Sequence, residues 1–141
     1  MNVTNKVLKL LGMKLASELI TGQVDPEVKL WRAVIVLAIE DVLNPSESRN
    51  ESVAKAEAHD LFVNNSDDFQ KVCYNGGLDA DWVRDRYLLA LDKGAVTFTT
   101  KQHLYVKYTK MYEQLRGVAD VQTRKKIQKA IEKLRTSIFE S

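Results

Sequence analysis

The sequence predicts an all-α fold of six or seven helices, with a central buried helix, a helix-turn-helix-like corner and a C-terminal helical hairpin. Of the 141 residues, 45% are hydrophobic and 28% are charged, which is typical of a globular chain, and six Gly and two Pro leave few interruptions. Apolar residues recur at intervals of three and four along most of the chain. The segment 95–99 has the β-branched composition of a strand, and it is either an extended connector or one edge of a hairpin.

Two helices are predicted in the N-terminal third. The first covers 4–20 and ends at Thr21-Gly22, where glycine can adopt the left-handed conformation that stops a helix. Its apolar stripe consists of Val7, Leu10, Leu11, Leu15 and Leu19. The second covers 27–43 and follows Asp25 as N-cap and Pro26 at the first helical position. Because apolar residues fill most of its circumference, we expect this helix to run through the centre of the fold.

Three shorter helices are predicted after the polar segment 44–50. An Ala-rich helix covers 51–63. Ser66 then caps a helix that ends at Gly76-Gly77, and Asp79 caps the next, over 80–91. The last two form a corner, residues 67–91, with the spacing of a helix-turn-helix.

Three positions in the corner carry that interpretation. Counted from Phe69, a small residue, Cys73, is fifth, Gly77 is ninth and the β-branched Val83 is fifteenth. A small side chain lets two helices approach, glycine supplies a positive φ in the turn, and Val83 packs the second helix on the first. The same pattern also fits an ordinary structural corner between helices, so both interpretations stay open.

The C-terminal part predicts a helical hairpin over 100–138. Thr99 and Gln102 fit a capping box that opens its first helix, and Asp120 caps its second. Isoleucine and leucine form a narrow apolar seam along the second helix, at Ile127, Ile131, Leu134 and Ile138. We therefore divide the chain into a helical core, 1–98, and a basic hairpin packed on it, 99–141.

Charge is distributed unevenly. Residues 1–100 carry 11 Lys and Arg against 15 Asp and Glu, whereas residues 101–141 carry ten against four. This asymmetry points either to a nucleic-acid backbone or an acidic protein as partner, or to a solvated lysine-rich helix face. In a DNA-binding interpretation, two residues approach bases or phosphates and four neutralise phosphates: Arg84 and Arg86, and then Arg124, Lys125, Lys126 and Lys129.

Two stretches resemble a known group of proteins. The run AEAHDLF at 56–62, followed by SDDFQKVCYNGGLDADWVRDR at 66–86, resembles a segment of small proteins of tailed phages and prophages. Trp31-Arg32-Ala33 fits the same pattern, whereas Asn75-Gly76 departs from it. The resemblance covers mainly 30–38 and 56–86, and it implies a helical phage accessory protein.

Several classes of function are not indicated. The sequence has no phosphate-binding glycine loop, dinucleotide fingerprint or nucleophile elbow, so we expect neither an enzyme nor a cofactor. His59 and His103 lack partners at metal spacing, and Cys73 is expected to be buried. The longest apolar run, 33–39, is too short to span a membrane, and a single cysteine suits a reducing compartment, so we expect a cytoplasmic protein, in the host cytoplasm if the chain is phage-encoded.

The leading interpretation is a non-enzymatic phage-type DNA-associated helix-turn-helix protein, either regulatory or an accessory in DNA packaging. The alternative is a helical protein–protein interaction or structural module without nucleic-acid binding, in which the seam joins copies into a homo-oligomer or binds another partner. A further possibility concerns tyrosines that alternate with lysines, because such a helix can stack bases of a single strand, or can instead form the rim of a helical core. These residues are Tyr105, Tyr108 and Tyr112, with Lys101, Lys107 and Lys110.

Overall fold

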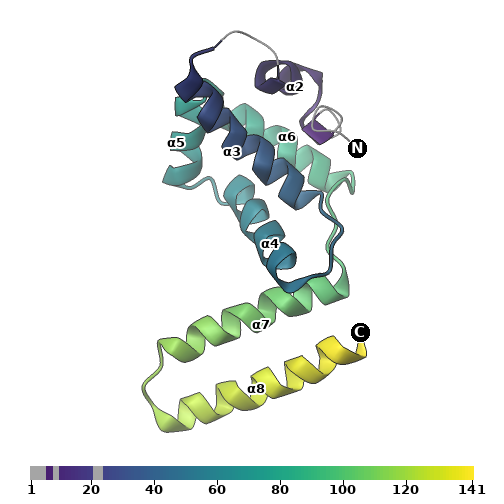
Figure 1. The fold of residues 1–141 in the computed structure, drawn as a ribbon, viewed down its shortest axis with the longest axis vertical. Helices are drawn as coiled ribbons and strands as arrows, with labels where there is room; N and C mark the ends of the chain where they lie inside the picture. The colour runs from purple at the N-terminus through teal and green to yellow at the C-terminus, as the bar shows by residue number, and fades with distance from the viewer. Residues whose placement is uncertain (1–5, 8–9, 21–23) are drawn as a thin grey trace. The chain divides into compact units, whose positions relative to one another are not determined.

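The structure is a computed structural model that describes residues 6–7, 10–20 and 24–141. This part of the chain contains helices and no strand, which confirms the all-α class (Figure 1). In chain order the helices are α2 (Met13–Ile20), α3 (Pro26–Val42), α4 (Arg49–Val63), α5 (Asp67–Asn75), α6 (Ala80–Asp92), α7 (Thr100–Arg116) and α8 (Val121–Glu140). None of the described helices combines the length and apolarity that crossing a bilayer requires.

Contacts divide the chain into two compact units. Unit 1 comprises Met1–Asn44 and Ala54–Thr97, and unit 2 comprises Pro45–Val53 and Phe98–Ser141. We predicted a boundary between residues 98 and 99 and assigned 45–53 to the helical core, whereas the contacts group this segment with the hairpin. Helix α4 accordingly begins in unit 2 and continues in unit 1.

The N-terminal helix is shorter than predicted. Residues 6–7 and 10–11 are helical, but Gly12 has a φ of +88° and α2 begins at Met13. This left-handed conformation interrupts the helix predicted over 4–20, because glycine adopts it at little cost. The predicted stop at Thr21-Gly22 lies outside the described residues.

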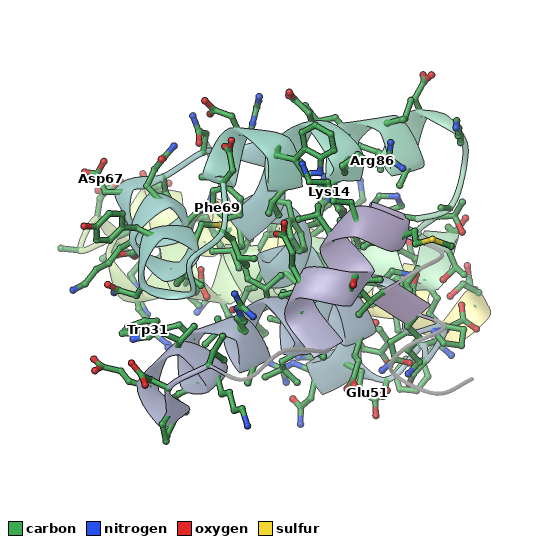
Figure 2. The ribbon with its side chains drawn as sticks, turned by 90° about the horizontal axis from the view of Figure 1, so that it is seen from above. Lys14, Trp31, Glu51, Asp67, Phe69 and Arg86 are labelled. Carbon is green, nitrogen blue, oxygen red and sulfur yellow. The ribbon has the colours of Figure 1, made fainter. Side chains whose placement is uncertain are left out.

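The core of unit 1 centres on three aromatic side chains, Phe62, Phe69 and Tyr87, all fully buried. The Phe62 ring stacks on the Tyr87 ring with centroids 4.4 Å apart, and it meets Phe69 edge-on at 6.1 Å. In Figure 2, Phe69 lies among the helices, whereas Asp67 of the same helical turn lies at the outer edge. Because the three rings come from α4, α5 and α6, their cluster fixes these helices against one another.

Helix α3 lines this core with one face. Ile35, Ala38, Ile39 and Val42 are buried, which confirms α3 as a core helix. The expectation of burial around most of its circumference is wrong. Leu37 is 58% exposed, and other apolar residues on the same side of the helix are exposed as well. The elements that contact α3, among them α2 and α5, cover its opposite face.

Local signals set the start of α5 and α6 as predicted. Ser66 Oγ accepts a hydrogen bond from the Phe69 amide at 3.2 Å. Asp79 Oδ1 accepts from the amides of Asp81 and Trp82 at 3.0 and 3.3 Å. Both side chains satisfy amides that the first helical turn leaves without partners.

The turn between α5 and α6 is a Schellman motif. Gly77 has a φ of +67°, its amide donates to Tyr74 O at 3.1 Å, and the Leu78 amide donates to Cys73 O at 2.8 Å. This confirms that Gly77 supplies the positive φ predicted for the corner.

In unit 2, α7 and α8 lie side by side and antiparallel (Figure 1). The capping box is present, since Thr99 Oγ1 accepts from the Gln102 amide at 3.1 Å and Gln102 Oε1 accepts from the Thr99 amide at 2.9 Å. The fully buried Gln102 also donates from Nε2 to Ser46 O at 2.9 Å. That bond ties the segment 45–53 to the start of α7.

The apolar seam of α8 lies within the hairpin. Ile131, Leu134 and Ile138 are at most 7% exposed, and Ile127 is half-buried. Because the seam is largely buried within the hairpin, little of it is exposed for a second copy, and the structure does not support the predicted homo-oligomer through it.

The segment 95–99 is an irregular connector rather than a strand. The buried Lys55 makes an unexpected hydrogen bond with this segment, donating from Nζ to Thr97 O at 2.6 Å. Burial lowers the pKa of Lys55. The sequence offered no signal for a lysine inside unit 1.

Candidate functional site

The basic charge belongs to unit 2. Its residues carry 11 Lys and Arg against six Asp and Glu, a net charge of +5, while unit 1 carries ten against 13, a net charge of −3. Unit 2 is therefore the part of the chain to which a polyanion would be attracted.

The two arginines predicted to approach bases or phosphates each make a hydrogen bond to the backbone within unit 1. Arg84 Nε donates to Val63 O at 3.2 Å, and Arg86 Nε donates to Leu11 O at 3.0 Å. Val63 is the last residue of α4, and Leu11 directly precedes the break at Gly12. Carbonyls at such helix ends lack partners within the helix, so the guanidinium groups satisfy them. These bonds engage the Nε of each arginine within unit 1, and the approach of Arg84 and Arg86 to bases or phosphates stays a prediction.

Arg124 has a similar place in unit 2. Its Nη1 donates to Leu115 O at 2.7 Å and to Val118 O at 2.8 Å, which fastens the turn of the hairpin. Arg32 also binds backbone carbonyls, in unit 1, where it donates to Gly76 O and Glu18 O. The predicted phosphate contact of Arg124 therefore competes with two backbone bonds.

The predicted lysines lie differently. Lys125, Lys126 and Lys129 are exposed, and Lys133 continues the row one turn further. At 100° per residue these four project from the face of α8 opposite the buried seam. We call them the lysine stripe.

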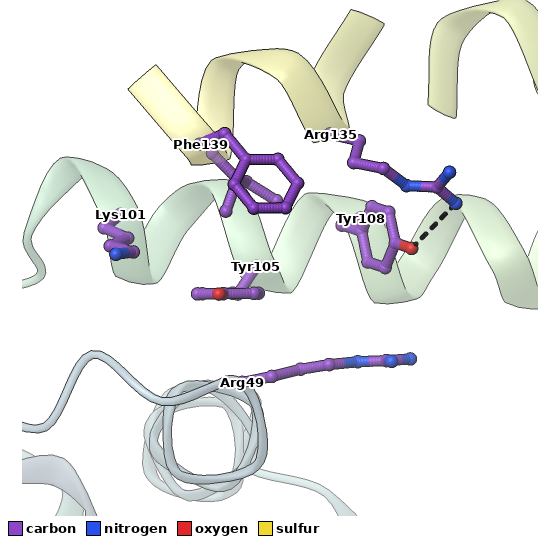
Figure 3. A pocket seen from close by; sticks show the side chains of 7 residues that line it. Arg49, Lys101, Tyr105, Tyr108, Arg135 and Phe139 are labelled. Atoms are coloured by element: carbon purple, nitrogen blue, oxygen red, sulfur yellow. Dashed lines mark hydrogen bonds between the residues drawn. The ribbon is translucent and has the colours of Figure 1, made fainter. Parts of the chain in front are cut away.

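A second feature of unit 2 is a groove of about 330 Å³ (Figure 3). It is lined by three cations and three aromatic rings, above the buried Ile138: Arg49, Lys101 and Arg135, and Tyr105, Tyr108 and Phe139. No acidic residue is among the described residues that line it. We call it the aromatic groove.

Tyr108 organises the aromatic groove. The Arg49 guanidinium lies 5.3 Å from its ring centroid, and Arg135 Nη2 donates to its hydroxyl at 3.3 Å. Arg135 also donates to the Tyr112 hydroxyl at 3.0 Å. The hydrogen bonds with Tyr112 and with Arg135, in that order, lower the pKa of Tyr108. Tyr108 thus orients two guanidinium groups whose remaining N–H donors can meet an anion.

The other candidates for chemistry are structural. Cys73 is fully buried, as predicted, and desolvation and then the Asp79 charge raise the pKa of its thiol to about 11. His59 Nδ1 lies 2.7 Å from the Tyr87 hydroxyl. Within the residues that the structure describes, no cluster of His, Cys, Asp and Glu could hold a metal ion. Among the described residues, these positions do not bring reactive groups close to one another.

Comparison with known proteins gives no relative, since no protein-family model, curated protein or solved structure matches this chain.

The aromatic groove was only partly predictable. Lys101, Tyr105 and Tyr108 follow one another at helical spacing and were considered together as a stacking surface. Arg49 and Phe139 were not predicted, because only the tertiary fold brings the segment 45–53 and helix α8 to α7. The one available signal for Phe139 is a large aromatic residue outside the seam register of α8.

Proposed function

We propose that this chain is a non-enzymatic, DNA-associated protein of the cytoplasm that holds duplex phosphates through the lysine stripe of α8. One observation carries the proposal: four exposed lysines project from a single helix face in the unit that holds the excess of positive charge. The regulatory or packaging role of such a protein belongs to the same proposal, together with the phage-type resemblance of 56–86.

The contact proposed here differs from that of a helix-turn-helix reader. With Arg84 and Arg86 bound to carbonyls, no base-reading contact is assigned to the corner. Lysine contacts to phosphates are independent of sequence. The proposed binding is therefore general for duplexes and sensitive to salt.

Replacing Lys125, Lys126 and Lys129 by Ala is expected to weaken duplex binding about tenfold and to reduce the slope of log K against log salt by about 2 to 3, because each phosphate contact contributes about 0.9. Fluorescence anisotropy of a labelled duplex across a salt series measures both quantities. The matched control replaces Lys29, Lys71 and Lys93, three exposed lysines of unit 1, and changes the net charge equally. Equal losses in both triple variants, or no binding by the wild type at low salt, would overturn the proposal.

A second candidate function is supported by α3. Leu30, Val34 and Leu37 are 67%, 39% and 58% exposed and repeat at intervals of four and three along one face. A groove of about 250 Å³ runs beside this face within unit 1, with Ala58 and Leu61 on its far side. Contiguous exposed apolar residues of this kind mark protein–protein contacts, and a second copy of the chain is the occupant that we test.

In this second case Leu37→Glu is expected to convert a dimer into a monomer, because the contact would bury a charge. Light scattering measures the mass. Leu89→Glu, at a 40% exposed position of α6, is the matched control and should leave the mass unchanged. A wild-type chain that is monomeric at all concentrations measured removes this candidate.

A further inference from the structure

The aromatic groove of unit 2 is separate from the lysine stripe. On α8, Arg135 lies beside the buried seam and Phe139 lies between the seam and the stripe. None of the four lysines of the stripe lines the groove, so the two features use different residues.

The exposed ring of Phe139 needs a physical account. It is 83% exposed and lines the same groove as the Tyr105 ring and the guanidinium groups of Arg49 and Arg135 (Figure 3). An apolar ring beside cations does not suit an aliphatic partner, which would leave the charges unpaired. It suits a ligand that combines a flat aromatic face with an anion, as a nucleotide does.

Two of the three cations are placed for the anionic part of such a ligand. Arg49, from the first turn of α4, and Arg135, from α8, both lie at the Tyr108 ring, whereas Lys101, in the first turn of α7, lies at the other end of the groove (Figure 3). The Arg49 guanidinium lies over the Tyr108 ring, and Arg135 donates to the Tyr108 hydroxyl from Nη2. The other N–H donors of each guanidinium group can therefore bind phosphate oxygens.

We infer that the aromatic groove binds an unpaired nucleotide of a single-stranded nucleic acid, with the base stacked on Phe139 and the adjoining phosphate held by Arg49 and Arg135. A volume of about 330 Å³ is near the lower end for small-ligand sites, which suits one base. The inference does not depend on duplex binding by the lysine stripe, since the groove uses other residues.

Phe139→Ala is expected to lower the affinity for a labelled oligothymidine of about ten nucleotides by about tenfold, because stacking on an aromatic ring contributes to binding base by base. Its affinity for the labelled duplex should stay within about twofold of the wild type. Phe139→Trp should restore single-strand binding, because a larger ring stacks at least as well. The matched control is Tyr74→Ala, which removes an 84% exposed ring from α5 of unit 1 and should change neither affinity.

The contribution of base stacking is tested by measuring how the wild type binds an abasic oligonucleotide of equal length and charge, which keeps the backbone and lacks the bases. Loss of binding to this oligonucleotide supports stacking, and unchanged binding overturns it. Competition by thymidine monophosphate at millimolar concentration shows that one nucleotide is enough, and a mononucleotide that competes equally with the duplex contradicts a separate groove. Equal losses of single-strand and duplex affinity in Phe139→Ala would likewise overturn the inference.

Discussion

Replacing Phe62 by Ala is expected to lower the free energy of unfolding of unit 1 by about 3–5 kcal/mol. Phe62 is fully buried, stacks on Tyr87 with the ring planes 13° apart, and contacts Phe69 edge-on. Its removal opens a cavity between three helices and leaves both other rings without a partner face. Urea unfolding followed by tryptophan fluorescence measures this loss in unit 1, where both tryptophans of the chain, Trp31 and Trp82, are located.

Phe139→Ala is the matched control for this prediction. The same side chain is removed at an 83% exposed position, so the free energy of unfolding should change by less than about 0.5 kcal/mol. Similar losses in the two variants would mean that Phe62 is not the centre of the core described above. The control also shows whether the groove variant remains folded when its nucleic-acid affinity is measured.

The start points of α5, α6, α7 and α8 were predictable because each depends on residues three positions apart or fewer. Ser66, Asp79, Thr99 and Asp120 all accept a hydrogen bond from an amide of the first helical turn, as their residue types indicated. Gly77 was predictable for a related reason, since the Schellman motif is completed within six residues. Gly12 was not, because nothing in its neighbouring residues distinguishes a helical glycine from a helix break.

The exposed face of α3 was not predictable from the composition of the helix. Leu30 and Leu37 are as apolar as the buried Ile35 and Ile39, but coverage depends on which helices return to that face. The hydrophobicity of a residue indicates that it can be buried, but the tertiary arrangement decides whether another helix covers it. The same limit hid Phe139, whose exposure gives the aromatic groove its stacking surface.

The direction of the arginines was beyond local reasoning as well. A surface arginine and an arginine that satisfies a helix-end carbonyl have the same sequence context, and Leu11 is 75 residues away from Arg86. Lysines were easier, since an ammonium on a long chain is strongly hydrated and is seldom fully buried. Lys55, which donates to Thr97 O inside unit 1, is the exception here.

Arg86→Met is expected to lower the free energy of unfolding of unit 1 by about 1.5–3 kcal/mol, because it leaves the buried Leu11 carbonyl without its charged donor. The guanidinium also lies directly against Gly12, where a Cβ would come within 2.5 Å of Nη2, so the arginine supports the left-handed break before α2. Methionine keeps the apolar stem and removes the donors, which isolates the hydrogen bond. Tryptophan fluorescence in urea measures the loss, and Figure 2 shows the position of Arg86 in unit 1.

Duplex affinity of the same variant separates a structural arginine from a DNA-reading one. Because its Nε is bound to Leu11 O, Arg86→Met should bind the duplex within about twofold of the wild type, measured well below the unfolding transition. The control, Arg116→Met, removes an exposed arginine of α7 and should leave the stability of unit 1 unchanged. Unchanged stability together with weaker or less selective duplex binding would reverse the assignment. It would return Arg86 to the base-contacting role that the spacing of the corner first suggested.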